Sequence, residues 1–154
     1  MDLDVSIDTA NIQAAFARFR ALGENPRLIT RQIAGILADS SEQAFADEKD
    51  PQTGRSWNDL SPQHIARRKK KGHWPGKILQ MQGLLAMSLT TGYSPTQAWI
   101  GSPMVYAAIH QLGGTSGMAP GPAAIPARPY MGLDGVGRQE VLQIIQKAVQ
   151  GSLS

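Results

Sequence analysis

The chain has 154 residues, a formal net charge of +3 and no cysteine. Its length fits a single domain over residues 1–154, and without cysteine it has no disulfide, thiolate catalysis or cysteine-bound zinc. The sequence contains no apolar run near the roughly 18 residues that cross a bilayer, and its acidic start is unlike a signal peptide. We therefore expect a protein made in a cytoplasm, with no membrane contact.

Charge is unevenly distributed. Residues 1–50 contain nine acidic and five basic side chains, residues 51–80 contain one acidic and seven basic ones, and no charged residue lies between Lys77 and Arg128. A solvated surface is normally rich in charge, whereas the centres of protein interfaces are depleted of it. We interpret the uncharged segment, residues 78–127, as a surface that meets other subunits. The alternative, a buried core followed by an uncharged loop, remains open.

The first fifty residues predict a strand and two helices. Residues 2–8 alternate between acidic or polar and aliphatic side chains, which is typical of a strand with one wet face. A helix then follows from about residue 10 to Leu22 and ends at Gly23. Asn25 and Pro26 start a long helix over residues 26–47. Its apolar positions at helical spacing are predicted to be buried: Ile29, Ile33, Ile36, Leu37, Ala44 and Phe45.

The middle of the chain predicts a turn and two short helices. Residues 50–54 have turn chemistry, and Trp57 and Leu60 are expected to anchor the loop after it. Ser61 caps a helix that starts at Pro62 and runs into a basic cluster. A further short helix is expected over residues 78–84.

The second half predicts a β-hairpin of residues 85–91 and 97–101 around a turn at residues 92–95. A short helix over residues 103–112 follows, and then a long loop rich in glycine and proline over residues 113–124.

Residues 125–133 are expected to be extended, because Pro126 and Pro129 prevent a regular helix. Asp134 caps the last helix, whose apolar face is Val141, Leu142, Ile145, Ala148 and Val149. The predicted class is α+β: a small antiparallel sheet packed against a long helix, with additional N- and C-terminal helices and a long Gly/Pro loop.

The residues offer little for catalysis or cofactor binding. Residues 72–77 resemble a phosphate-binding loop, but only three residues separate the glycines and Ile78 stands where a Ser or Thr is needed. His64, His73 and His110 have no spacing that pairs them on one helix face. The uncharged segment contains only His110 as a general acid or base. We predict no catalytic, metal or cofactor residues and find none that would serve a hydrolase.

The basic cluster is defined here as Arg67, Arg68, Lys69, Lys70 and Lys71. Lysine and arginine side chains neutralise phosphates, and the nearby Trp74 offers a ring for stacking on a base. A solvated helix end, where positive charge suits the helix dipole, is the alternative. The cluster is therefore a candidate DNA-facing surface within a larger assembly.

Four segments together resemble the phage virion morphogenesis family, the tail completion proteins of Mu-like and related phages. They are Asp50-Pro51-x-x-Gly54-x-x-Trp57-x-x-Leu60, residues 78–85, residues 100–102 with 106–114, and residues 125–133. The family usually has a Thr where this chain has Gln82. The segments follow one another in the family's order over residues 45–133, with an amphipathic helix on each side.

The resemblance implies a structural tail completion protein at the head–tail neck of a virion, made in the bacterial host cytoplasm. It implies a homo-oligomer, expected to be a hexameric ring, that joins tail to head. Expected neighbours are connector or stopper, tail terminator and tail tube proteins, with genomic DNA passing through. The alternatives are a tail terminator or stopper of the same neck, or a nucleic-acid-binding protein that uses the basic cluster.

The predicted contact surface lies around the loop at residues 113–124. Pro126 and Pro129 hold Arg128 in a fixed direction, where it pairs with a carboxylate at a subunit contact or with helix carbonyls of its own fold. We favour the subunit contact. The interface candidates are Tyr106, His110, Gln111, Arg128, Pro129 and Tyr130.

Overall fold

The computed structural model describes residues 10–21, 25–80, 82–114 and 125–153. In chain order its elements are α1 (Ala10–Ala21), α2 (Arg27–Asp47), α3 (Pro62–Lys70), α4 (Leu84–Met87), β1 (Thr90–Tyr93), β2 (Ala98–Gly101), α5 (Ala107–Leu112) and α6 (Gly135–Leu153). The expected strand at residues 2–8 and most of the Gly/Pro loop lie outside the described residues.

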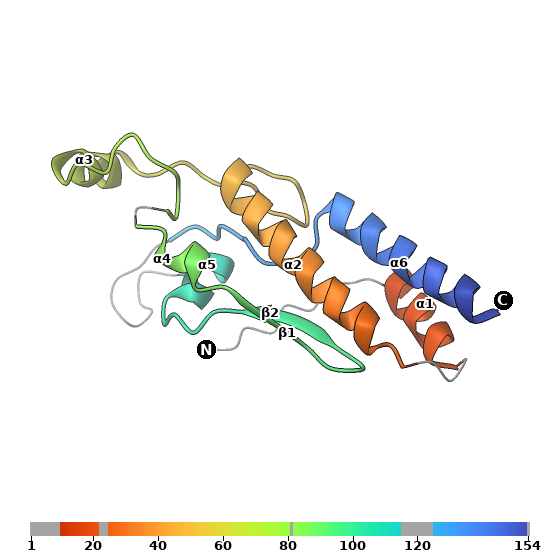
Figure 1. Ribbon diagram of the computed structural model, residues 1–154. Coiled ribbons are helices and arrows are strands. Elements are labelled where there is room, and N and C mark those ends of the chain that lie inside the picture. The colour runs from red at the N-terminus through yellow and green to blue at the C-terminus, as the bar shows by residue number, and fades with distance from the viewer. Residues whose placement is uncertain (1–9, 22–24, 81, 115–124, 154) are drawn as a thin grey trace.

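The long helix α2 is the centre of the molecule (Figure 1). It packs against the hairpin of β1 and β2 and against α6, and α6 in turn packs against α1. The predicted α+β class, with a small antiparallel sheet on a long helix, is therefore confirmed. Among the described residues, no helix has the length and hydropathy that a membrane span requires.

Helix α2 forms where its apolar residues recur at helical spacing. Ile29, Ile36 and Leu37 face the core, and Ile33 packs against it half-buried. The helix ends at Glu48, which adopts the left-handed conformation at φ 55° and donates its backbone N–H to Ala44. This cap turns the chain sharply away from the helix axis.

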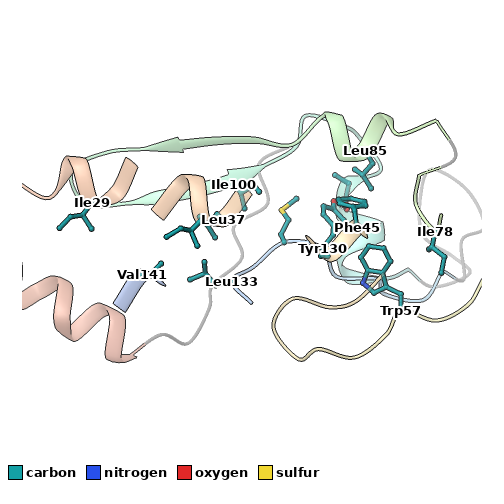
Figure 2. Close-up of a cluster of buried hydrophobic side chains, with 14 of the residues drawn as sticks. Ile29, Leu37, Phe45, Trp57, Ile78, Leu85, Ile100, Tyr130, Leu133 and Val141 are labelled. Atoms are coloured by element: carbon teal, nitrogen blue, oxygen red, sulfur yellow. The ribbon is translucent and has the colours of Figure 1, made fainter. Parts of the chain in front are cut away.

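The core has two parts along α2 (Figure 2). Toward the helix layer, buried aliphatic side chains gather: Ile29, Leu37, Ile100, Leu133, Val141 and Ile145. Toward the other end, the Phe45 ring meets Trp57 edge-on at 5.7 Å and Tyr130 at 5.2 Å between ring centroids. The expectation that Trp57 anchors its loop is confirmed, since its side chain is buried.

The hairpin is shorter and lies further along the chain than predicted. Thr90 pairs with Gly101 and Tyr93 with Ala98, so the turn covers residues 94–97 rather than 92–95. Gly92 belongs to the strand, where a Cβ would lie only 2.4 Å from the Trp99 ring. The glycine therefore makes room for a cross-strand indole and does not form the turn.

Two of the predicted short elements need correction. Residues 78–80 are not helical, because Ile78 and Gln80 bond to the end of α2 and Leu79 takes a positive φ of 61°. The helix α4 starts only after Gly83, in a segment predicted to be strand. Helix α5 starts at Ala107, since the Ser102 hydroxyl accepts the Met104 N–H and holds residues 102–104 in a turn.

Two predicted helix caps are confirmed. The Ser61 hydroxyl accepts the His64 N–H at 3.2 Å at the start of α3. The Asp134 carboxylate accepts the Gly137 N–H at 2.6 Å at the start of α6. Each satisfies one of the backbone donors that a helix start leaves unpaired.

Candidate functional site

The four segments that carry the family resemblance meet at one end of α2. Arg128 makes the main link between these segments. Its Nε donates to the carbonyl of Asn58 at 2.9 Å, and its Nη2 donates to the carbonyl of Asp59 at 3.0 Å. Its backbone N–H donates to the carbonyl of His110 at 2.8 Å. One residue therefore joins the loop after Trp57 to helix α5.

Tyr130 and Gln111 make a second link. The Gln111 Oε1 accepts the backbone N–H groups of Tyr130 at 2.9 Å and of Met131 at 3.1 Å. The Tyr130 hydroxyl donates to the carbonyl of Ala107 at 2.8 Å. Burial raises the pKa of Tyr130, so the hydroxyl keeps its proton and remains a donor.

Trp57 completes this arrangement, because its indole N–H donates to the carbonyl of Pro129 at 2.7 Å. We call Trp57, Gln111, Arg128 and Tyr130 the junction. All four side chains are buried, and each bonds to backbone far away in the sequence. The junction ties residues 57–59, α5 and residues 128–131 into one unit.

These contacts correct part of the predicted interface. Arg128 is 6 % exposed, Gln111 is 6 % exposed and Tyr130 is fully buried, so their side chains lie inside the subunit and not on its surface. The guanidinium of Arg128 donates to backbone carbonyls of its own fold and not to a carboxylate of a neighbour, although these carbonyls belong to a loop and not to a helix. Pro129 is half-buried against Trp57.

The remaining candidates, Tyr106 and His110, line a cleft. Their rings meet edge-on at 5.8 Å between centroids. The cleft has a volume of about 580 Å³ and lies between α3, α4, α5 and the chain around Arg128. Its lining residues are Asn58, Asp59, Leu60, Ser61, His64, Arg68, Leu79, Gln82, Gly83, Leu84, Leu85, Tyr106, His110, Ile125, Pro126 and Arg128.

The cleft is electropositive and largely apolar. Arg68 and Arg128 line it, against one acidic residue, Asp59. Burial lowers the pKa of His110, and the nearby Arg128 lowers it further. Burial and the neighbouring arginines likewise lower the pKa of His64. Both imidazoles are therefore neutral at pH 7, and the two guanidinium groups provide the fixed charge.

The basic cluster divides between surface and interior. Arg67, Lys69, Lys70 and Lys71 are exposed, in agreement with a solvated or DNA-facing surface. Arg68 is 4 % exposed, and its Nη1 donates to the carbonyl of Lys77 at 2.9 Å. Arg68 is therefore not on the exposed basic face, because it lies on the inner side of α3.

The described residues contain no group of three His, Asp or Glu side chains placed to bind a metal ion. The arrangement instead combines a fixed junction with an open cleft next to it. Such a combination suits recognition of another chain, since the buried bonds hold the walls of the cleft in one shape.

Comparison with known proteins identifies the family. The model of the phage virion morphogenesis family matches residues 7–150. The chain belongs to this family. It is 46 % identical over 153 residues to the "putative capsid assembly protein G" of Escherichia phage Mu, covering 99 % of this chain and 97 % of that protein.

Two Mu-like prophage proteins of Haemophilus influenzae are also similar. "Mu-like prophage FluMu G protein 1" is 36 % identical, covering 96 % of this chain and 94 % of that protein. "Mu-like prophage FluMu G protein 2" is 28 % identical and covers 96 % of each. No solved structure gives a significant match.

The cleft and the buried role of Arg68 were missed by sequence reasoning. Arg68 follows His64 by four residues and Ile65 by three, so the three share a face of α3. That spacing was a usable signal that Arg68 points inward. No local sequence pattern indicated the cleft, because its walls come from four separate segments of the chain.

Proposed function

We propose that the protein is a structural tail completion subunit, which forms a ring at the head–tail neck of the virion and joins tail to head. Membership of the virion morphogenesis family supports a role in virion assembly, and a similar protein of phage Mu carries the name of a capsid assembly protein.

One observation carries the proposal to this chain. Among the residues whose side-chain exposure the structure describes, seven large hydrophobic ones are exposed, and five of them come from the uncharged segment: Leu84, Met87, Trp99, Val105 and Leu112. Met87 and Val105 are 73 % and 78 % exposed. Exposed apolar surface is a mark of contact sites, and these five side chains share one segment of the chain. The uncharged segment is therefore the surface proposed to meet other subunits.

In the proposed ring, each subunit contacts its two neighbours through this surface. We take the ring to contain six copies of the chain. A stable contact of this kind buries on the order of 800 Å² on each partner. Connector or stopper, tail terminator and tail tube proteins are the proposed neighbours above and below the ring.

Particles made without this chain test the proposal. Lysates of a phage that lacks it are expected to contain heads and tails that are not joined, as seen by electron microscopy, and adding the purified protein restores infectious particles. Complete, infectious particles in the untreated lysate would rule the proposed role out. Native mass spectrometry of the purified protein measures the number of copies in the ring.

A second function is favoured by the exposed part of the basic cluster. Arg67, Lys69, Lys70 and Lys71 lie on the surface of α3 or at its end, at the far end of the molecule from α1 and α6 (Figure 1). DNA passing through a ring would meet such a surface. The wild-type protein should then be retained on DNA with a steep loss between low and moderate salt. A variant with these four residues changed to Gln should lose that retention, and equal retention of both proteins dismisses the idea.

A further inference from the structure

Two residues that line the cleft, Arg68 and His110, have buried polar atoms without a partner among the described residues. Arg68 is 4 % exposed, yet its Nε–H has no hydrogen-bond acceptor among the described residues, and the buried Nδ1 of His110 also lacks a partner. Buried donors are normally satisfied in a native protein. Because both residues line the open cleft, we look for the missing partner in an occupant of the cleft.

The charge of the cleft indicates that the acceptor is an anion. Arg68 and Arg128 both line it, and a guanidinium binds a carboxylate or a phosphate more strongly than a neutral group. The remaining lining combines apolar side chains such as Leu79, Leu84 and Tyr106 with a few polar ones and one carboxylate, Asp59. An occupant that fits both properties alternates acidic and apolar side chains.

An acidic peptide fits this cleft better than a nucleic acid backbone. Three donors of the two lining arginines already bond to backbone carbonyls of the subunit, so few remain for a row of phosphates. Four basic side chains could follow a phosphate backbone, but they are exposed on α3 or at its end and do not line the cleft: Arg67, Lys69, Lys70 and Lys71. An extended peptide needs only one or two ion pairs beside apolar contacts.

The chain itself contains a segment with this chemistry. Residues 2–8 carry Asp at positions 2, 4 and 8 and aliphatic side chains at positions 3, 5 and 7, without a basic side chain. In an extended segment the two sets point to opposite sides, so one side is acidic and the other apolar.

We propose that the cleft receives residues 2–8 of a second copy of the chain. The inference rests on the proposed self-assembly, and it assigns one contact of the ring. Helix α1, which follows this segment, packs on α6, whereas α3 and α4 lie toward the opposite end of α2 (Figure 1). That placement favours the cleft of a neighbour over the cleft of the same chain. A ring then fills every cleft with one segment.

Cysteine cross-linking of the full chain tests this contact, because the natural sequence contains no cysteine. Val5→Cys protein is mixed with Leu84→Cys protein and treated with a short bis-maleimide. A cross-linked heterodimer is expected to form several times faster than with the control partner Val136→Cys, whose side chain is 67 % exposed on α6, against 48 % for Leu84. Changing Asp2, Asp4 and Asp8 to Asn in the Val5→Cys chain should reduce the cross-linking about tenfold, as expected when the loss of ion pairs costs one power of ten in affinity.

Three results would overturn the proposal. The first is equal cross-linking to Leu84→Cys and Val136→Cys. The second is cross-linking confined to single chains that carry both Val5→Cys and Leu84→Cys, which places the segment in its own cleft. The third is protection of Leu84→Cys from maleimide by a single-stranded oligonucleotide but not by a peptide of residues 1–9, which makes the cleft a nucleic-acid site.

Sedimentation of the same samples separates this inference from the proposed function. Oligomers without the specific cross-link contradict the segment exchange alone. A protein that stays monomeric and uncross-linked contradicts both the exchange and the ring.

Discussion

The two ends of α2 are stabilised in different ways. At one end, α2, α6 and the hairpin pack through aliphatic side chains such as Ile29, Val141 and Ile145, and α1 packs on α6. At the other end, residues 48–61, 71–80 and 125–134 lie outside the helices and strands, and side chains bonded to distant backbone hold them together.

This difference separates the residues that build the subunit from those free to contact others. Four motif residues at the irregular end, Trp57, Gln111, Arg128 and Tyr130, are buried in the junction, where they replace the backbone pairing that a sheet would supply. Four exposed apolar side chains come from α4, from the chain before α5 and from α5 itself: Leu84, Met87, Val105 and Leu112. A motif residue is therefore not by itself a contact residue in this family member.

The largest expected effect is the loss of the Tyr130 ring. Tyr130→Ala removes a fully buried side chain that packs on Phe45, and it should lower the free energy of unfolding by about 3–5 kcal/mol. Tyr130→Phe keeps the ring and loses only the bond to Ala107, for about 1–2 kcal/mol. Denaturant unfolding measures both. Similar costs for the two variants would show that the hydroxyl, and not the packing, dominates.

Arg128 distinguishes geometry from charge. Arg128→Lys keeps the charge but loses the planar fork that reaches Asn58 and Asp59. We expect it to destabilise the protein by about 2–3 kcal/mol, nearly as much as Arg128→Met, with faster amide exchange at residues 57–60. A lysine variant as stable as the wild type would show that the two carbonyl bonds contribute little.

Two glycines of the helix layer provide the matched contrast. In Gly137→Ala the new Cβ would lie 2.7 Å from the Ser40 hydroxyl, so we expect a loss of about 1–3 kcal/mol from overpacking. Gly35 lies in α2 with no neighbour within 4 Å of a new Cβ. Gly35→Ala should therefore raise the free energy of unfolding by up to about 1 kcal/mol, and the thermal midpoint with it. Equal effects of the two would contradict the close packing of α6 on α2.

The smallest effect concerns pH. Burial, and then Arg128, lower the pKa of His110 in the folded protein. Well above the unfolded pKa of about 6.5, His110 is neutral in both states and adds no pH dependence. Below that, the unfolded chain takes up the proton first, so stability falls as pH falls toward the folded pKa. The His110→Gln protein should lose less stability between pH 7 and pH 5 than the wild type, and an equal loss would exclude this contribution.

The regular parts of the fold were predictable because local patterns determine them. The apolar spacing of α2 and α6 and the caps at Ser61 and Asp134 are read over a few residues. The predicted position of the hairpin turn was wrong because Gly92 suggested a turn, whereas the structure requires this glycine to make room for the Trp99 ring across the sheet.

The site was harder to predict, since its bonds span about 20 to 70 residues of sequence. Arg128 was recognised as an oriented charge, but its partners are carbonyls of residues 58 and 59, and any residue has a carbonyl. Gln111 likewise bonds to backbone N–H groups. Side chains that bond to backbone have no complementary residue type for a sequence pattern to reveal.

The recovery of infectious particles by two matched surface variants tests the central claim most directly. One variant changes Met87, Val105 and Leu112 to Ser in the uncharged segment, and the other changes Leu28 and Val136, which are as exposed but lie elsewhere. Both should keep the thermal midpoint of the wild type. The account predicts that the first lowers the titre at least about tenfold, as for contacts worth 1.4 kcal/mol or more, while the second assembles normally. Equal titres for the two variants would contradict it.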